Sequence, residues 1–185
     1  MSFIASHLKR EGYRCYGYDY PTRIRRMDHH GKELADRLLL WPEKRFDVVT
    51  HSMGGLILRE ALSRAPELQE RIGRIVMIAP PNQGSDLARF WREKFPVAER
   101  LVVPLSDLSS ESGSPVYELP NLPGELEFGV LAAENDHAVS EERTHLAWER
   151  EHRILPGRHT SILFRKRTAE TVGHFLRHGN FGIPG

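Results

Sequence analysis

The feature that most constrains the fold of this chain is the alternation of short apolar runs with helix-like patterns. The apolar runs are rich in branched and aromatic residues, as buried strands are, and the segments between them repeat apolar residues at helical spacing. Strands are predicted at residues 13–20, 46–50, 74–79, 126–133 and 152–155, and the main helices at 27–41, 54–64 and 168–178. This repeated order predicts an α/β protein with a mostly parallel sheet flanked by helices.

Size and charge narrow the class of protein. With 185 residues the chain can bury one substantial core, and we expect a single domain over residues 1–185. Lysine and arginine total 26 against 25 for aspartate and glutamate, which argues against a nucleic-acid-binding protein. The chain has one cysteine, Cys15, which rules out an internal disulfide and a cysteine zinc site. Because Cys15 lies in an apolar and aromatic run, we expect a buried structural thiol.

The sequence carries no recognisable targeting or membrane signal. Its first residues run into His7 and Lys9 without a long apolar region. No stretch approaches the roughly 18 apolar residues of a membrane span. We therefore expect a cytoplasmic protein without stable membrane insertion.

Residues 96–123 interrupt the alternation. This segment holds five of the twelve prolines, together with a cluster of serines. We expect an irregular insertion above the sheet, for which two interpretations are open: a cover over the functional site or an ordinary surface loop.

A predicted strand, a tight turn and a predicted helix meet at Ser52. The segment Thr50-His51-Ser52-Met53-Gly54-Gly55 directly follows an apolar run and directly precedes a helical pattern. A nucleophilic serine on a sharp strand-to-helix turn needs small flanking residues. Gly54 meets that need, whereas Thr50 replaces the usual glycine. The alternative is a serine that only caps the helix.

Hydrolysis by a serine also requires a general base and an acid that orients the base. Asp136 follows the predicted strand at 126–133, and His159 follows the last predicted strand. Both residues therefore fall where the carboxyl ends of parallel strands gather and ligands bind. Glu134 is the rival acid, because it is nearer to its strand and equally charged. His137, next to Asp136, is expected to line the pocket.

The remaining histidines are assigned to packing or to the surface. His51 is predicted to pack rather than to act as the base, because adjacent residues on a tight turn point apart. His29 and His30 are expected to face solvent, as are His174 and His178, whose i, i+4 spacing has no third metal ligand nearby. We expect no metal and no organic cofactor.

These pieces together resemble the α/β-hydrolase superfamily, and more narrowly its small bacterial lipase- and esterase-like group. The resemblance extends over nearly the whole chain, and the string Pro80-Pro81-Asn82-Gln83-Gly84-Ser85 narrows it more than the serine motif does. The other matching pieces are Asp19-Tyr20-Pro21, residues 49–55, residues 77–79 and His159-Thr160. The resemblance implies Ser52 as nucleophile, Asp136 as acid and His159 as base. The backbone N–H of Met53 would be one oxyanion-hole donor.

The chain departs from this group at its beginning. The group starts with a further strand whose His-Gly loop supplies the second oxyanion donor, and that segment is absent here. Residue 1 falls where the group has its first helix, which would end near Gly12. We therefore expect an N-terminally truncated hydrolase fold that starts at an internal methionine. The missing strand would either leave strand edges unpaired or let residues 13–20 close up against the strand at 46–50.

The expected function is hydrolysis of a small-molecule carboxylic ester through an acyl-enzyme. An acyltransferase that uses an alcohol in place of water is a close variant. The alternative from another class is a non-catalytic or impaired hydrolase-fold protein that lacks half of the oxyanion hole. A nucleotide- or phosphate-binding α/β protein is disfavoured, because the sequence has no glycine-rich phosphate loop.

Overall fold

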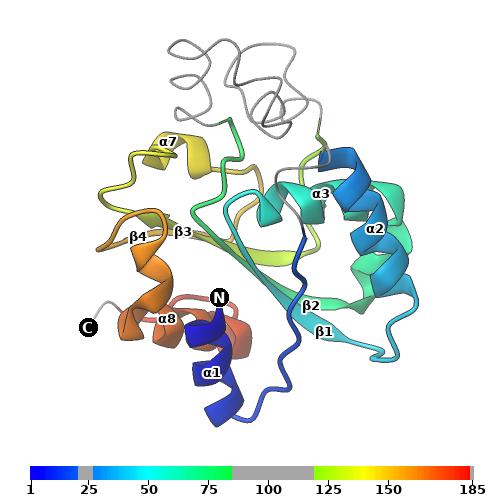
Figure 1. Cartoon of the computed structure of the whole chain (residues 1–185), viewed down its shortest axis with the longest axis horizontal. Coiled ribbons are helices and arrows are strands. Elements are labelled where there is room, and N and C mark those ends of the chain that lie inside the picture. The colour runs from blue at the N-terminus through cyan, green and yellow to red at the C-terminus, as the bar shows by residue number, and fades with distance from the viewer. Residues whose placement is uncertain (21–26, 85–118, 184–185) are drawn as a thin grey trace.

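A four-stranded parallel sheet forms the centre of the molecule (Figure 1). The structure, a computed structural model, describes residues 1–20, 27–84 and 119–183. The strands are β1 (Phe46–His51), β2 (Ile72–Ile78), β3 (Glu127–Ala133) and β4 (Glu151–Leu155), and they lie across the sheet in that order. All three neighbouring pairs are parallel, which confirms the predicted α/β fold class.

Helices cover both faces of this sheet (Figure 1). On one face α1 (Ser2–Arg10) packs with α8 (Lys166–His178), and on the other α2 (Met27–Leu39) packs with α3 (Gly54–Arg64). The short elements η1 (Pro66–Arg71), α7 (Glu141–Thr144) and η3 (Ser161–Phe164) belong to the connections. The helices predicted from the sequence are confirmed, with bounds shifted by two residues or fewer at each end.

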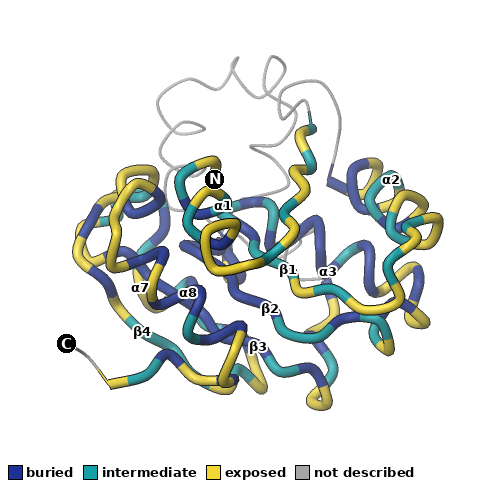
Figure 2. The backbone as a smooth tube through the Cα atoms, turned by 90° about the horizontal axis from the view of Figure 1, so that it is seen from below, coloured by how far each residue is buried: buried dark blue, intermediate teal, exposed yellow. Residues whose placement is uncertain are grey.

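Strand β2 explains why the sheet needs helices on both sides. Val76 and Ile78 belong to the core cluster under α1 and α8, whereas Ile75 and Met77 belong to the cluster under α2 and α3. All four are fully buried. Successive residues of a strand point to opposite faces, so an unbroken apolar strand requires a cover on each. Figure 2 shows the buried residues running through the central strands, with exposed residues toward the periphery.

Two glycines fit α8 to the sheet and end it. A Cβ on Gly129 of β3 would lie 2.6 Å from ring atoms of both Phe175 and Phe181, so only glycine allows this close approach. At the other end of the helix, Gly179 adopts φ 73° and its N–H donates to the carbonyl of Phe175. This left-handed cap confirms the predicted stop at Gly179.

The prediction of a strand at residues 13–20 is wrong. The segment makes no strand hydrogen bonds to the described part of the sheet, and β1 pairs only with β2 there. Tyr13 and Cys15 instead pack their half-buried side chains against the core beside α1. In the described residues, therefore, the segment does not close up against β1.

The expected insertion at residues 96–123 falls mostly outside the described residues. Only 119–123 are described, and there Leu119 and Leu122 are buried. The cover, like the single-domain organisation, stays a prediction.

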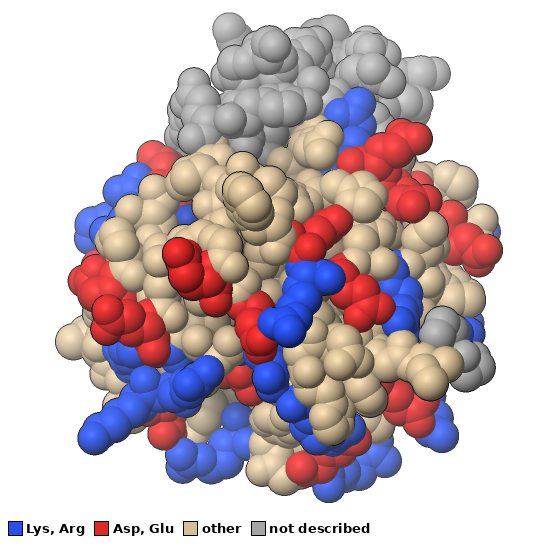
Figure 3. All heavy atoms as spheres, turned by 180° about the vertical axis from the view of Figure 1, so that it is seen from behind, with Lys and Arg blue, Asp and Glu red and all other residues tan. Residues whose placement is uncertain are grey.

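No helix among the described residues is long and apolar enough to cross a membrane. On the face drawn in Figure 3, acidic and basic side chains interleave.

Candidate active site

Ser52 lies on a strained turn between β1 and α3. Its φ is 52°, in the left-handed region that residues other than glycine rarely adopt. The strand side of the turn is fixed because the Ser52 N–H donates to the carbonyl of Ile78 on β2, at 2.9 Å. The helix side is fixed because α3 begins two residues later, at Gly54. Strain of this kind persists only where the surroundings enforce it, and it is common at functional sites.

Small residues let this turn sit close to the sheet. A Cβ on Gly55 would lie 3.2 Å from the Pro80 side chain, which is tight. On Gly54 it would meet Thr50 and Tyr20 at ordinary contact distances of 3.6 and 3.5 Å. The sequence interpretation placed the need for a small residue at Gly54, yet Gly55 is the more crowded position. Thr50 is accommodated at the usual glycine position, with its side chain buried beneath α3.

Three of the predicted site residues come together above the carboxyl ends of the strands. His159 Nε2 lies 2.9 Å from Ser52 Oγ, and His159 Nδ1 lies 2.7 Å from Asp136 Oδ2. An ionised carboxylate only accepts hydrogen bonds, so Nδ1–H must donate to Asp136. In the neutral ring this leaves Nε2 unprotonated, as the acceptor for the Ser52 hydroxyl.

The carboxyl of Asp136 is held by its own loop. Its side chain is 1% exposed, and Oδ1 accepts the backbone N–H groups of Ala138 and Val139 at 2.8 and 3.0 Å. Burial alone would raise the pKa of Asp136, but the hydrogen bonds from His159, Val139 and Ala138 hold that pKa below its ordinary value. The rival Glu134 is exposed; its backbone N–H donates to the carbonyl of Leu155, and its carboxylate has no hydrogen bond to another described residue.

The backbone N–H of Met53 is available as a donor. Met53 is 7% exposed, and its N–H makes no hydrogen bond within the described ranges of the chain. It belongs to the amino end of α3, where no side chain caps the helix. The first N–H groups of a helix have no partner inside the helix and favour negative charge.

His51 does more than the packing predicted for it. Its Nε2 lies 2.9 Å from the backbone carbonyl of His159, and the two rings are 4.9 Å apart. Burial lowers the pKa of His51 to about 4, although its hydrogen bond to His159 opposes this. The neutral ring therefore donates Nε2–H to that carbonyl and ties the His159 loop to β1. In the sequence, only the position of His51 next to Ser52 could have indicated this role.

A buried guanidinium below the site was also missed. Arg59 of α3 is 3% exposed and donates to the carbonyl oxygens of Leu119 and Pro120 at 2.8 and 3.1 Å, and more loosely to Asn82. Burial lowers its pKa to about 10. Asn82 in turn donates to the carbonyl of Thr144 at 2.8 Å. Arg59 thus ties α3 to the segments on both sides of residues 85–118.

A pocket of about 440 Å³ adjoins the loops that carry Asp136 and His159. Its lining includes His137 and basic side chains from the connection between β4 and α8, but not Ser52, Asp136 or His159. The lining residues are Glu134, Asn135, His137, Pro156, Gly157, Arg158, Ser161 and Arg165. The pocket therefore offers polar groups of both signs beside the Asp136–His159 pair.

The prediction that His30 faces solvent is wrong. The residue is fully buried, with its ring 5.1 Å from the ring of Tyr20, because it points from α2 toward the core rather than outward. Its neighbour His29 is exposed as expected, as is His178, while His174 is half-buried and bonded to the carbonyl of Asn180.

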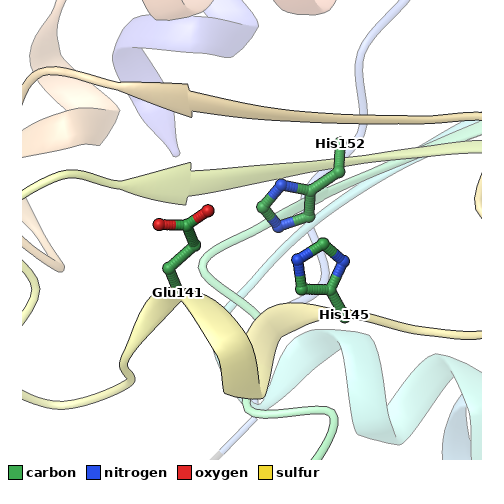
Figure 4. Close-up of side chains that lie close together, drawn as sticks. All are labelled: Glu141, His145 and His152. Carbon is green, nitrogen blue, oxygen red and sulfur yellow. The ribbon is translucent and has the colours of Figure 1, made fainter.

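One group of described side chains has metal-ligand chemistry, namely Glu141, His145 and His152 (Figure 4). The two imidazoles stack at 3.8 Å with planes 20° apart. Nitrogen lone pairs lie in the ring plane, so nearly parallel stacked rings do not aim them at one ion. His145 is bonded to Glu149 and His152 to Thr144, at 2.5 and 2.8 Å. This geometry fits a stack that joins α7 to β4 better than a tetrahedral metal centre.

Comparisons with known proteins give a family and a fold. A family model described as "Domain of unknown function (DUF7379)" matches residues 1–97. No curated protein matches the sequence. Among solved structures, the mature Bacillus licheniformis lipase BlEst2 superposes with TM-score 0.70 and 18% identity, covering 96% of this chain and 83% of the lipase.

Two further structures are similar over less of their own length. Phospholipase PlaB from Legionella pneumophila has TM-score 0.70 and 15% identity, covering 97% of this chain and 55% of the phospholipase. The metagenomic carboxyl esterase MGS0156 has TM-score 0.69 and 18% identity, covering 86% of this chain and 58% of the esterase. The likeness establishes an α/β-hydrolase fold.

Proposed function

The chain belongs to the family described as a domain of unknown function, DUF7379, and on its hydrolase fold we propose that it is a serine hydrolase that cleaves carboxylic esters. One observation carries the proposal. The imidazole of His159 is 2.9 Å from the hydroxyl of Ser52 and 2.7 Å from the carboxylate of Asp136. These separations are within the reach that proton transfer requires.

The proposed chemistry has two halves. As Ser52 Oγ attacks the acyl carbonyl, His159 Nε2 takes its proton, and Asp136 stabilises the imidazolium through Nδ1–H. His159 then protonates the departing alcohol, leaving an acyl-enzyme on Ser52. In the second half His159 takes a proton from water, which attacks the acyl carbonyl, and then gives the proton to the departing Ser52 Oγ as the acid is released.

The negative charge of the tetrahedral intermediate would form beside the amino end of α3. Among the described residues the N–H of Met53 has no partner, so it can donate a hydrogen bond to this oxyanion without breaking another bond there. Loss of one such donor typically lowers kcat by about 10²–10³-fold. The second donor, which the resemblance assigns to a loop before α1, is the part of the site for which this chain offers no candidate among the residues described.

The names of the similar structures support an ester substrate. They are a lipase, a carboxyl esterase and a phospholipase. Their shared chemistry is acyl transfer from an oxygen ester, for which this arrangement of side chains is suited. An acyltransferase would use the same acyl-enzyme with an alcohol as acceptor.

The second candidate function is a hydrolase-fold protein that is impaired in turnover. It is favoured by the described part of the site, in which β1 lies at the edge of the sheet and the N–H of Met53 is the one candidate oxyanion donor. Such a protein would keep a reactive Ser52 but turn over slowly, because one oxyanion donor would be missing.

A fluorophosphonate probe tests the proposal directly. We expect labelling of the wild-type chain, loss of labelling in Ser52→Ala, and undiminished labelling in the matched control Ser63→Ala, an exposed serine of α3. Hydrolysis of nitrophenyl esters of increasing chain length then separates turnover from labelling alone. A folded wild-type chain that takes up no probe would overturn the proposal. Labelling without turnover would favour the second candidate.

A further inference from the structure

The amino end of α8 carries positively charged side chains, although negatively charged side chains stabilise this end of a helix. Arg165 precedes the first turn, which begins with Lys166 and Arg167 and contains no acidic residue. No side chain caps this end. The first N–H groups of any helix lack intrahelical partners and give this end a partial positive charge. The three cations therefore lie beside the partial positive charge of the helix end, which is an unfavourable arrangement.

These cations have little internal compensation. Within the described part of the chain, Arg165 and Arg167 form no ion pair or side-chain hydrogen bond. Lys166 Nζ lies 3.3 Å from Glu170 Oε1, but both side chains are largely exposed, at 81% and 50%. A pair so exposed interacts weakly. Within the described residues, most of this positive charge is therefore uncompensated.

The same helix end opens into a pocket of about 290 Å³. Its lining residues are Leu155, Pro156, Arg165, Lys166, Arg167 and Thr168. Thr168 is one of these lining residues: it is fully buried, and its Oγ1 has no hydrogen-bond partner among the described residues. A buried hydroxyl without a protein partner is uncommon, and a bound water or ion is one explanation for it.

We propose that this pocket binds a phosphate group. The anion would accept hydrogen bonds from the free N–H groups of the first turn and from the Thr168 hydroxyl, and would be neutralised by Arg165 and Arg167. A phosphate has enough oxygens to meet all of these donors at once, and arginine matches its geometry. No glycine-rich loop is needed, because the helix itself supplies the N–H groups.

Two sources of phosphate fit the surroundings. A soluble phosphate ester would fill a pocket of this size. A phospholipid headgroup would also be met by Phe164, which precedes the cations and is 58% exposed, as aromatic residues at membrane surfaces are. The site shares Pro156 and Arg165 with the pocket beside the Asp136 loop, yet it does not involve Ser52. Ser52→Ala should therefore bind phosphate as the wild type does.

Titration with inorganic phosphate, at constant ionic strength, tests the site. The readout is the chemical shift of the amide groups of Lys166, Arg167 and Thr168, which should move with saturation. We expect Arg165→Gln/Arg167→Gln to weaken binding at least tenfold and Thr168→Val to weaken it severalfold. The matched control, Lys32→Gln/Arg37→Gln, removes two exposed cations from α2 and should change the affinity less than twofold.

Vesicles identify the source of the phosphate. Binding to phosphatidylglycerol vesicles but not to phosphatidylcholine vesicles, lost in the Arg165/Arg167 double variant, assigns the site to headgroups. Binding of inorganic phosphate and glycerol phosphate without vesicle binding assigns it to soluble esters. Either result supports the proposal once thermal melts show that the variants are folded. Absence of both, or an equal loss in the α2 control, overturns it.

Discussion

Helices α3 and α8 both begin near the carboxyl end of the sheet. Neither has a capping side chain or an acidic residue in its first turn, but the surroundings of the two helix starts differ. The start of α3 is enclosed by apolar residues such as Leu56 and Ile57. The start of α8 is exposed and surrounded by Arg165, Lys166 and Arg167.

The contrast indicates what each set of free N–H groups is prepared for. A helix end without charged side chains in its first turn can stabilise a charge that appears only during a reaction, because no bound ion has to be displaced when it forms. A site that concentrates cations is suited to an anion that stays bound. In our proposals the first is the oxyanion on an acylated Ser52, and the second is a phosphate at Thr168.

The largest expected effect falls on the α3 side. Asp136→Asn should lower kcat/KM for a nitrophenyl ester by about 10³–10⁴-fold, because the amide no longer holds His159 in the tautomer that accepts the serine proton. Asparagine can still accept the backbone N–H groups of Ala138 and Val139, so the fold should persist.

The rival acid supplies the matched control for this variant. Glu134→Gln should change kcat/KM by less than about threefold, since no hydrogen bond joins its carboxylate to the His159 loop. Phosphate binding at α8 should be the same in both variants. Equal losses of activity in Asp136→Asn and Glu134→Gln would contradict the assignment of the acid and break the comparison.

The next largest effect concerns His51, which is neutral in the folded protein and lies beside the start of α3. Burial holds the pKa of His51 at about 4, below its ordinary value of 6.5. As pH falls from 6.5 to 4 the unfolded chain takes up a proton that the folded chain refuses, so folding loses stability over this window. The full loss attributable to His51 is about 3 kcal/mol, and it is absent above pH 6.5.

His51→Gln measures this contribution. Glutamine can still donate to the carbonyl of His159 but does not titrate. Denaturant unfolding of both proteins between pH 7.5 and 4 should give free energies that converge as the pH falls, with the wild type losing more. Parallel curves would mean that His51 is charged or exposed in the folded protein, and that the α3 side tolerates resting charge.

The sequence predicted most of the sheet and the three residues at its carboxyl edge, for reasons that are local. Apolar runs bounded by proline and glycine locate β1, β2 and β3, and chain order alone places Asp136 and His159 beyond their strands. Pairing is not local. Residues 13–20 have the composition of a strand, but whether they join a sheet depends on what lies beside them.

Other residues were missed for the same reason, because their roles depend on neighbours that are distant in the sequence. Arg59 looks like an exposed helix residue until the carbonyl groups of Leu119 and Pro120 are brought to it. His30 was placed in solvent because a helical pattern does not reveal how deeply one face is covered. The cations at the start of α8 gave no signal, because the proposed site also depends on the pocket and on the unpartnered Thr168, which the sequence does not reveal.

The smallest effect tests the α8 side without any ligand. Arg167→Glu places a carboxylate in the first turn, where it meets the free N–H groups, and in phosphate-free buffer of low ionic strength it should raise the free energy of unfolding by about 0.5–1 kcal/mol. The gain should shrink in 0.5 M salt. The control is Arg177→Glu in the last turn, which should be destabilising, because it opposes the helix dipole and breaks the ion pair with Glu11. If Arg167→Glu is destabilising as well, the cations are already compensated, and the two helix ends do not differ in the way proposed.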